Sequence, residues 1–141
     1  LILQLFLIFY YLIFYFYYYY IKNNIIFGTE ITGDITSASL LFIQGHVKGN
    51  ISCSSTVIIG ETGKITGDII CIDAEIEGNV QGTIKVENLL CLKATSNIIG
   101  NIETVRLSIE EGAQFDGACK MKRIEDNTSP KFIEETVDEI E

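Results

Sequence analysis

The 141-residue sequence is short of several kinds of side chain: it has no tryptophan, one histidine, one proline, and 10 lysines and arginines against 19 acids. The net charge of −9 argues against nucleic acid as a partner, because phosphate binding needs clustered cations. His46 has no cysteine or aspartate cluster around it at ligand spacing, so we interpret it as a surface residue.

Catalytic and metal-binding motifs are also missing from the sequence. The four cysteines, at positions 53, 71, 91 and 119, are separated by 18, 20 and 28 residues, which matches no zinc or redox motif. We interpret them as small hydrophobic residues in a reducing cytosol. No Ser-His-Asp set, phosphate-binding loop or paired carboxylates can be recognised. We therefore expect a protein that is not an enzyme and that uses no metal, cofactor or nucleotide.

The first 26 residues form a hydrophobic leader. Residues 1–21 carry no charge and contain all seven tyrosines of the chain. Such a run is long enough to span the roughly 30 Å apolar core of a bilayer, with Lys22 as its cytoplasmic flank. The alternative is mistranslated upstream sequence, since the chain starts at Leu1 and is rich in residues with AT-rich codons. In that case any membrane contact would depend on Ile25, Ile26 and Phe27.

A repeat dominates residues 27–121. The pattern apolar-x-Gly-x-apolar occurs six times, with glycine intervals of 16, 18, 15, 18 and 17 residues. Because strand side chains alternate between faces, both apolar positions point inward. They form two columns, which are Ile31, Val47, Ile65, Val80, Ile98 and Phe115 before the glycine, and Ile35, Ile51, Ile69, Ile84, Ile102 and Cys119 after it.

A repeat of about 17 residues suits one coil of a β-helix built from three short strands. We therefore predict an all-β, three-sided parallel β-helix of about six coils, with the two columns stacked inside it. The repeat glycines are expected at corners where a side chain would not fit. Asp34, Asp68 and Asp116 beside them are interpreted as corner residues rather than calcium ligands. Cys53 and Cys71 should stack on adjacent coils, where reduced thiols are favoured over a disulfide.

The final segment, residues 122–141, has a basic start and an acidic end. Its composition predicts a disordered tail. The tail serves either as a solvating segment or as an arm that binds client proteins.

The segment Ile59-Gly-Glu-Thr-Gly-Lys-Ile-Thr-Gly-Asp-Ile69 resembles the bactofilins, bacterial polymer-forming cytoskeletal proteins, and the resemblance extends over residues 27–121. It implies a right-handed β-helix that assembles without nucleotide into non-polar filaments at the inner face of the cytoplasmic membrane. It also implies a scaffold for cell shape, with cell-wall synthesis or hydrolysis proteins as clients. Phe115 matches a phenylalanine that the family associates with the polymer contact.

Solenoid geometry favours self-assembly independently, because an open coil exposes strand edges and an apolar cross-section. Phe115, the largest residue of its column, lies in the last coil. Two alternatives remain: a membrane-tethered β-helix adaptor that binds clients without long filaments, and a β-helix enzyme of the acyltransferase type. The enzyme is disfavoured because no insertion is long enough to form a pocket.

Overall fold

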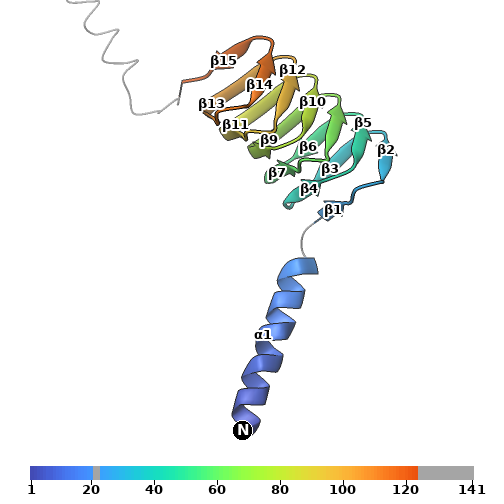
Figure 1. Cartoon of the computed structure of the whole chain (residues 1–141), viewed down its shortest axis with the longest axis vertical. Helices are drawn as coiled ribbons and strands as arrows, with labels where there is room; N and C mark the ends of the chain where they lie inside the picture. Colours follow the sequence, from blue (N-terminus) through green and yellow to red (C-terminus); the bar gives the residue numbers. More distant parts are fainter. Residues whose placement is uncertain (21–22, 124–141) are drawn as a thin grey trace, which may run out of the picture.

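The computed structural model describes residues 1–20 and 23–123, without the side chains of residues 17–20. One helix, α1 (Ile2–Tyr20), precedes a stack of short strands (Figure 1). The strands are β1 Asn23–Ile25, β2 Glu30–Thr32, β3 Ile35–Ser37, β4 Leu41–Ile43, β5 His46–Lys48, β6 Ile51–Cys53, β7 Thr56–Ile59, β8 Lys64–Thr66, β9 Ile69–Ile76, β10 Asn79–Gln81, β11 Ile84–Leu92, β12 Asn97–Ile99, β13 Ile102–Ile109, β14 Gln114–Asp116 and β15 Cys119–Met121.

Every strand pairing is parallel and joins one coil to the next. One side of the stack is a six-stranded sheet in the order β14-β12-β10-β8-β5-β2. A nine-stranded sheet forms the other two sides, because β11 bends between Val86 and Leu89, where its register with β9 and β13 shifts. The first and last coils lie at opposite ends of the stack (Figure 1). The predicted parallel β-helix of about six coils is confirmed.

The two columns of apolar residues are superposed coil upon coil. In the six-stranded sheet Val47 pairs with Ile65, Ile65 with Val80, and Val80 with Ile98. The second column stacks in the same way from Ile35 through Ile51, Ile69, Ile84 and Ile102 to Cys119. From Val47 to Ile102 these side chains are almost wholly buried, so they form the centre of the hydrophobic core.

The repeat glycines that have a coil beneath them occupy corners where a side chain would overlap the backbone. Gly67 has φ +148°, and a Cβ placed on it would fall on the carbonyl oxygen of Gly49, one coil earlier. The same overlap recurs at the next repeat glycines along the chain, because each coil turns directly above the previous one. The predicted steric role of these glycines is confirmed.

Aspartate and asparagine side chains join the coils beside those glycines. Asp34 Oδ1 accepts a hydrogen bond from the Asn50 N–H at 2.9 Å, and Asn50 Oδ1 accepts one from the Asp68 N–H at 3.0 Å. Asp68 Oδ1 in turn accepts the Thr83 N–H at 2.9 Å. The predicted corner role of Asp34 and Asp68 is thereby confirmed. Asn50 separates the two aspartates, which keeps like charges from stacking directly.

Both predicted boundaries of the β-helix need adjustment. The β-structure starts at Asn23 rather than at residue 27, because β1 pairs with β4 and places Ile25 against Ile43. At the other end Lys122, assigned to the tail from sequence, still follows the last coil: its N–H donates to the Thr104 carbonyl oxygen at 2.8 Å. The rest of the predicted tail, from residue 124 to 141, lies outside the described residues.

The helix α1 is apolar along its length, and its described hydrophobic side chains are more than half exposed. Among the residues that the structure describes, no helix is both long enough and apolar enough to cross a bilayer.

Candidate polymer interface

Phe115 lies on β14, in the last coil of the six-stranded sheet. It pairs with Ile98 of the preceding coil and extends the column that begins at Ile31. Its side chain packs against the core but is only half-buried, whereas Ile98 is fully buried. The difference arises because, within the described part of the chain, Ile98 has a coil on both sides and Phe115 has one on a single side.

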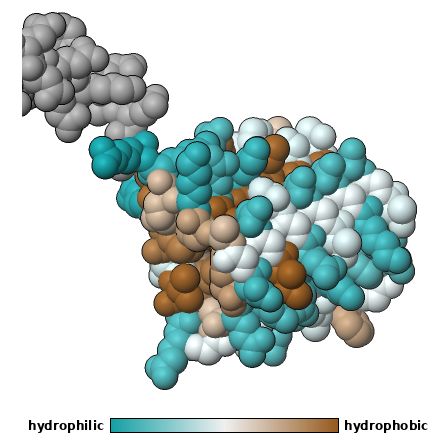
Figure 2. Space-filling model, turned by 90° about the horizontal axis from the view of Figure 1, so that it is seen from above, coloured by the Kyte–Doolittle hydropathy of each residue, from teal (hydrophilic) through white to brown (hydrophobic). Residues whose placement is uncertain are grey.

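The other inward positions of the last coil are exposed as well. Ile109 is 53% exposed and Met121 51%, while Leu92 and Thr104, their partners one coil back, are fully buried. Cys119 is also exposed, although it pairs with the buried Ile102. Figure 2, which looks onto this end of the stack, shows hydrophobic surface gathered there beside hydrophilic groups. We refer to Leu107, Ile109, Phe115, Cys119 and Met121 together as the C-terminal face.

Strand edges accompany this apolar surface. Among the described residues, β14 pairs only with β12 and β15 only with β13. The second half of β13, Arg106–Ile109, pairs only with β11. An unpaired edge presents backbone N–H and C=O groups to any strand that can align with it. The C-terminal face therefore offers both apolar contacts and backbone hydrogen bonds.

The opposite end of the stack is open in a similar way. Ile31 and Ile35 start their columns and are half-buried. A Cβ added at Gly33 would meet no atom within 4 Å, in contrast to the repeat glycines with a coil beneath them. We refer to Ile31, Gly33 and Ile35 as the N-terminal face.

The three residues expected to contact a membrane differ in their surroundings. Ile26 and Phe27 are 63% and 74% exposed, in the turn that follows β1. Ile25, in contrast, is buried and belongs to the core cluster. The expectation for Ile25 is therefore wrong, since its side chain is the first member of an inward column and points away from solvent.

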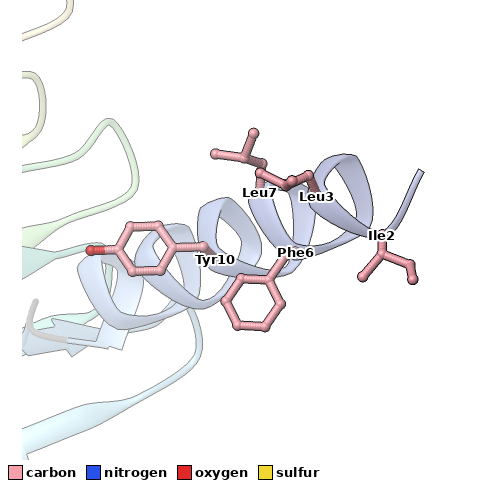
Figure 3. A pocket seen from close by; sticks show the side chains of 5 residues that line it. All are labelled: Ile2, Leu3, Phe6, Leu7 and Tyr10. Atoms are coloured by element: carbon pink, nitrogen blue, oxygen red, sulfur yellow. The ribbon is translucent and has the colours of Figure 1, made fainter.

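The described part of the chain offers few groups that could form an active site. No group of three or more His, Cys, Asp or Glu side chains there could hold a metal ion. His46 begins β5, between Glu30 and Lys64, and is half-buried rather than fully at the surface. Figure 3 shows a hollow lined only by α1 side chains: Ile2, Leu3, Phe6, Leu7 and Tyr10. These side chains offer a single hydroxyl and no charge, which supports no obvious chemistry.

Cys53 and Cys71 are buried, and all four cysteines are free thiols. The Cys53 thiol donates to the carbonyl oxygen of Ser39, with Sγ 3.4 Å from the oxygen. Burial, with a smaller contribution from Cys53, raises the pKa of Cys71 to about 12. A thiol that holds its proton so firmly is a poor nucleophile, which agrees with the predicted role of a small core residue.

Two features escaped the sequence analysis. A further inward column runs through Cys71, Val86, Thr104 and Met121, and its polar member Thr104 is fully buried with its hydroxyl donating to the Arg106 carbonyl oxygen. A group of basic residues also gathers around β15. Two of its members, Lys122 and Arg123, are the basic start of the predicted tail, but only the stacking of the coils brings Arg106 and Lys120 beside them.

A stack of parallel coils with core residues uncovered at its ends defines a solenoid repeat protein whose two ends are open to association. A family model described as "Bactofilin: Polymer-forming cytoskeletal" matches residues 23–120. The chain therefore belongs to the bactofilin family, a structural family of polymer-forming cytoskeletal proteins. Comparison with curated proteins gives no significant match, and neither does comparison with solved structures.

Proposed function

We propose that this chain is a structural, non-enzymatic protein whose β-helices join end to end into nucleotide-independent, non-polar filaments. One observation carries the proposal: inward positions that are fully buried in the fifth coil are only half-buried, as at Phe115, or well exposed, as at Ile109 and Met121, in the last coil. Exposed apolar surface of this kind favours association, at roughly 25 cal/mol per Å² removed from water.

The proposed filament has no polarity because each end meets a copy of itself. Contact of two C-terminal faces is isologous, so the same residues, Phe115 among them, enter the contact from both copies around a two-fold axis. The N-terminal faces join in the same manner. Alternating contacts of the two kinds extend the chain of molecules in both directions.

We further propose that the filament lies on the inner face of the cytoplasmic membrane and acts there as a scaffold for proteins of cell-wall synthesis or hydrolysis. The support is the exposure of Ile26, Phe27 and the apolar side chains of α1, all on the N-terminal side of the stack. Apolar side chains of this size gain free energy at a lipid interface.

The test compares two substitutions of the full chain, Phe115→Arg and Ile70→Arg. Ile70 is an outward-facing residue of β9, 49% exposed, so Ile70→Arg adds the same charge without changing either end of the stack. We expect filaments by electron microscopy from the wild type and Ile70→Arg, and dispersed molecules with unchanged β-sheet circular dichroism from Phe115→Arg. Filaments from Phe115→Arg would overturn the proposed interface.

The same experiment distinguishes filament formation from the adaptor alternative. A wild-type chain that binds membranes but stays monomeric across salt and pH would indicate a tethered adaptor instead of a filament former.

A further inference from the structure

A hollow of about 770 Å³ lies on the flank of the last two coils. It follows the bend where the second and third sides of the β-helix meet, and β15 forms one border. Its lining residues are Glu87, Asn88, Val105, Arg106, Lys120, Met121, Lys122 and Arg123. We call it the basic hollow. The chain leaves the β-helix within it, at Arg123.

The charge of the basic hollow opposes that of the whole chain. It contains four cations and one carboxylate, Glu87, in a protein with a net charge of −9. Lys122 also pairs with Glu103 outside the hollow, with Nζ 3.2 Å from Oε1. The other three cations, Arg106, Lys120 and Arg123, form no ion pair with any described residue. A local excess of positive charge is therefore left for an acidic partner.

The hollow is apolar as well as basic. Val105 and Met121 line it between the cations, and Met121 is 51% exposed. A suitable occupant therefore carries both carboxylates and apolar side chains. Inorganic anions do not supply the apolar contacts, and the net charge of −9 disfavours nucleic acid.

The chain itself supplies a segment with this composition. Residues 124–141 contain seven acids and one lysine, a net charge of −6 (1 minus 7). Their last part, Pro130-Lys-Phe-Ile-Glu-Glu-Thr-Val-Asp-Glu-Ile-Glu141, interleaves five of those acids with Phe132, Ile133, Val137 and Ile140. Six residues join Arg123 to Pro130. A link this short gives an effective concentration on the order of millimolar at the hollow, so weak contacts are enough for occupancy.

We propose that residues 130–141 of the chain bind in the basic hollow of the same molecule. The acids pair with Arg106, Lys120 and Arg123, and the apolar residues contact Val105 and Met121. Because Met121 also belongs to the C-terminal face, a bound tail covers one margin of that face. The binding itself requires no filament, so it holds or fails separately from the proposed function.

The test uses a fluorescent peptide of residues 130–141 and the full chain carrying E134Q, E135Q, D138N and E139Q, which neutralises its own tail. We expect the peptide to bind this variant in low salt at least about fivefold more tightly than the wild type, whose tail competes. Lys120→Glu in the neutralised chain should weaken binding about fivefold, the effect of losing one partly exposed ion pair and placing a like charge beside the carboxylates of the peptide. Arg123→Glu is a second variant that removes a cation of the hollow. Because Arg123 lies beyond the last strand, this change leaves every strand intact.

The matched control is Lys64→Glu, an equal charge change on the outer surface of β8, and it should leave peptide affinity unchanged. Zero-length carbodiimide coupling of the dilute wild-type chain should also join Lys120 to an acid of the tail within one molecule. Equal peptide affinity for the wild type and the neutralised chain would overturn the proposal, and so would equal losses in Lys64→Glu and Lys120→Glu.

Discussion

Ile98 and Phe115 are neighbours in one inward column, paired across β12 and β14, yet Ile98 is fully buried and Phe115 is only half-buried. Both residues obey the same repeat, so the difference comes from position alone. Ile98 has a neighbouring coil on each side, whereas among the described residues Phe115 has a neighbouring coil on one side only. The same contrast separates Leu92 from Ile109, which makes the open end of the stack a property of the whole last coil.

We expect Gly67→Ala to destabilise the chain by roughly 3 kcal/mol, because the new Cβ meets the Gly49 carbonyl oxygen and φ is positive. Gly33→Ala is the control, since it shares the positive φ but has no atom within 4 Å of the added Cβ. It should cost about 1–2 kcal/mol, the backbone contribution alone. Urea denaturation of both variants measures the difference, and equal losses would contradict the proposed overlap.

Core packing predicts that alanine substitutions in the second column lower the stability by different amounts, according to how deeply each isoleucine is buried. Ile69→Ala leaves a cavity between two coils and should cost roughly 2–5 kcal/mol. Ile35→Ala, in the half-buried first coil, should cost about 1–2 kcal/mol. Both changes are best measured by denaturation of the Phe115→Arg chain, in which assembly adds no stability. A larger loss for Ile35→Ala than for Ile69→Ala would show that the core is centred elsewhere.

Cys71 predicts a loss of stability at high pH. Burial raises the pKa of its thiol from 9.0 to about 12, so above pH 9 the unfolded chain releases a proton that the folded chain keeps. The contribution of this thiol to the free energy of unfolding is therefore complete below pH 9. It falls by about 1.4 kcal/mol per pH unit as the pH rises toward 12. Denaturation of the wild type and Cys71→Val between about pH 8 and 11 isolates this contribution. Parallel stability profiles for the two chains would contradict it.

Membrane contact through the turn after β1 is tested by Ile26→Ser combined with Phe27→Ser. Both side chains are well exposed, so we expect the fold to persist while flotation with anionic vesicles decreases severalfold. Ile99→Ser, at an exposed position on the outer surface of β12, is the control and should leave flotation unchanged. Unaltered flotation of the double variant would remove these residues from the proposed contact and leave α1 as the candidate.

The repeat could be predicted from sequence because it acts through two strong local rules. Alternation of side chains along a strand assigns Ile65 and Ile69 to the interior, and a glycine at regular intervals marks the corner between them. These rules give the columns, the number of coils and the open ends. The family assignment follows from the same segments.

Other features depend on neighbours that a periodic pattern does not reveal. β1 was missed because Asn23 and Asn24 carry no apolar signal, and only pairing with β4 shows that Ile25 is buried. Thr104 is polar by residue type, yet it occupies an inward column because its hydroxyl bonds the Arg106 carbonyl oxygen. The basic hollow joins β11, β13 and β15, so its residues become neighbours only when the coils stack.

Cryo-electron microscopy of filaments grown from the full chain is the most direct measurement of end-to-end assembly. We expect continuous β-helices in which two C-terminal faces meet around a two-fold axis, with the Phe115 side chains of both copies buried at the junction. Filaments whose copies touch through their outer sheet surfaces, with Phe115 still exposed to solvent, would contradict the account.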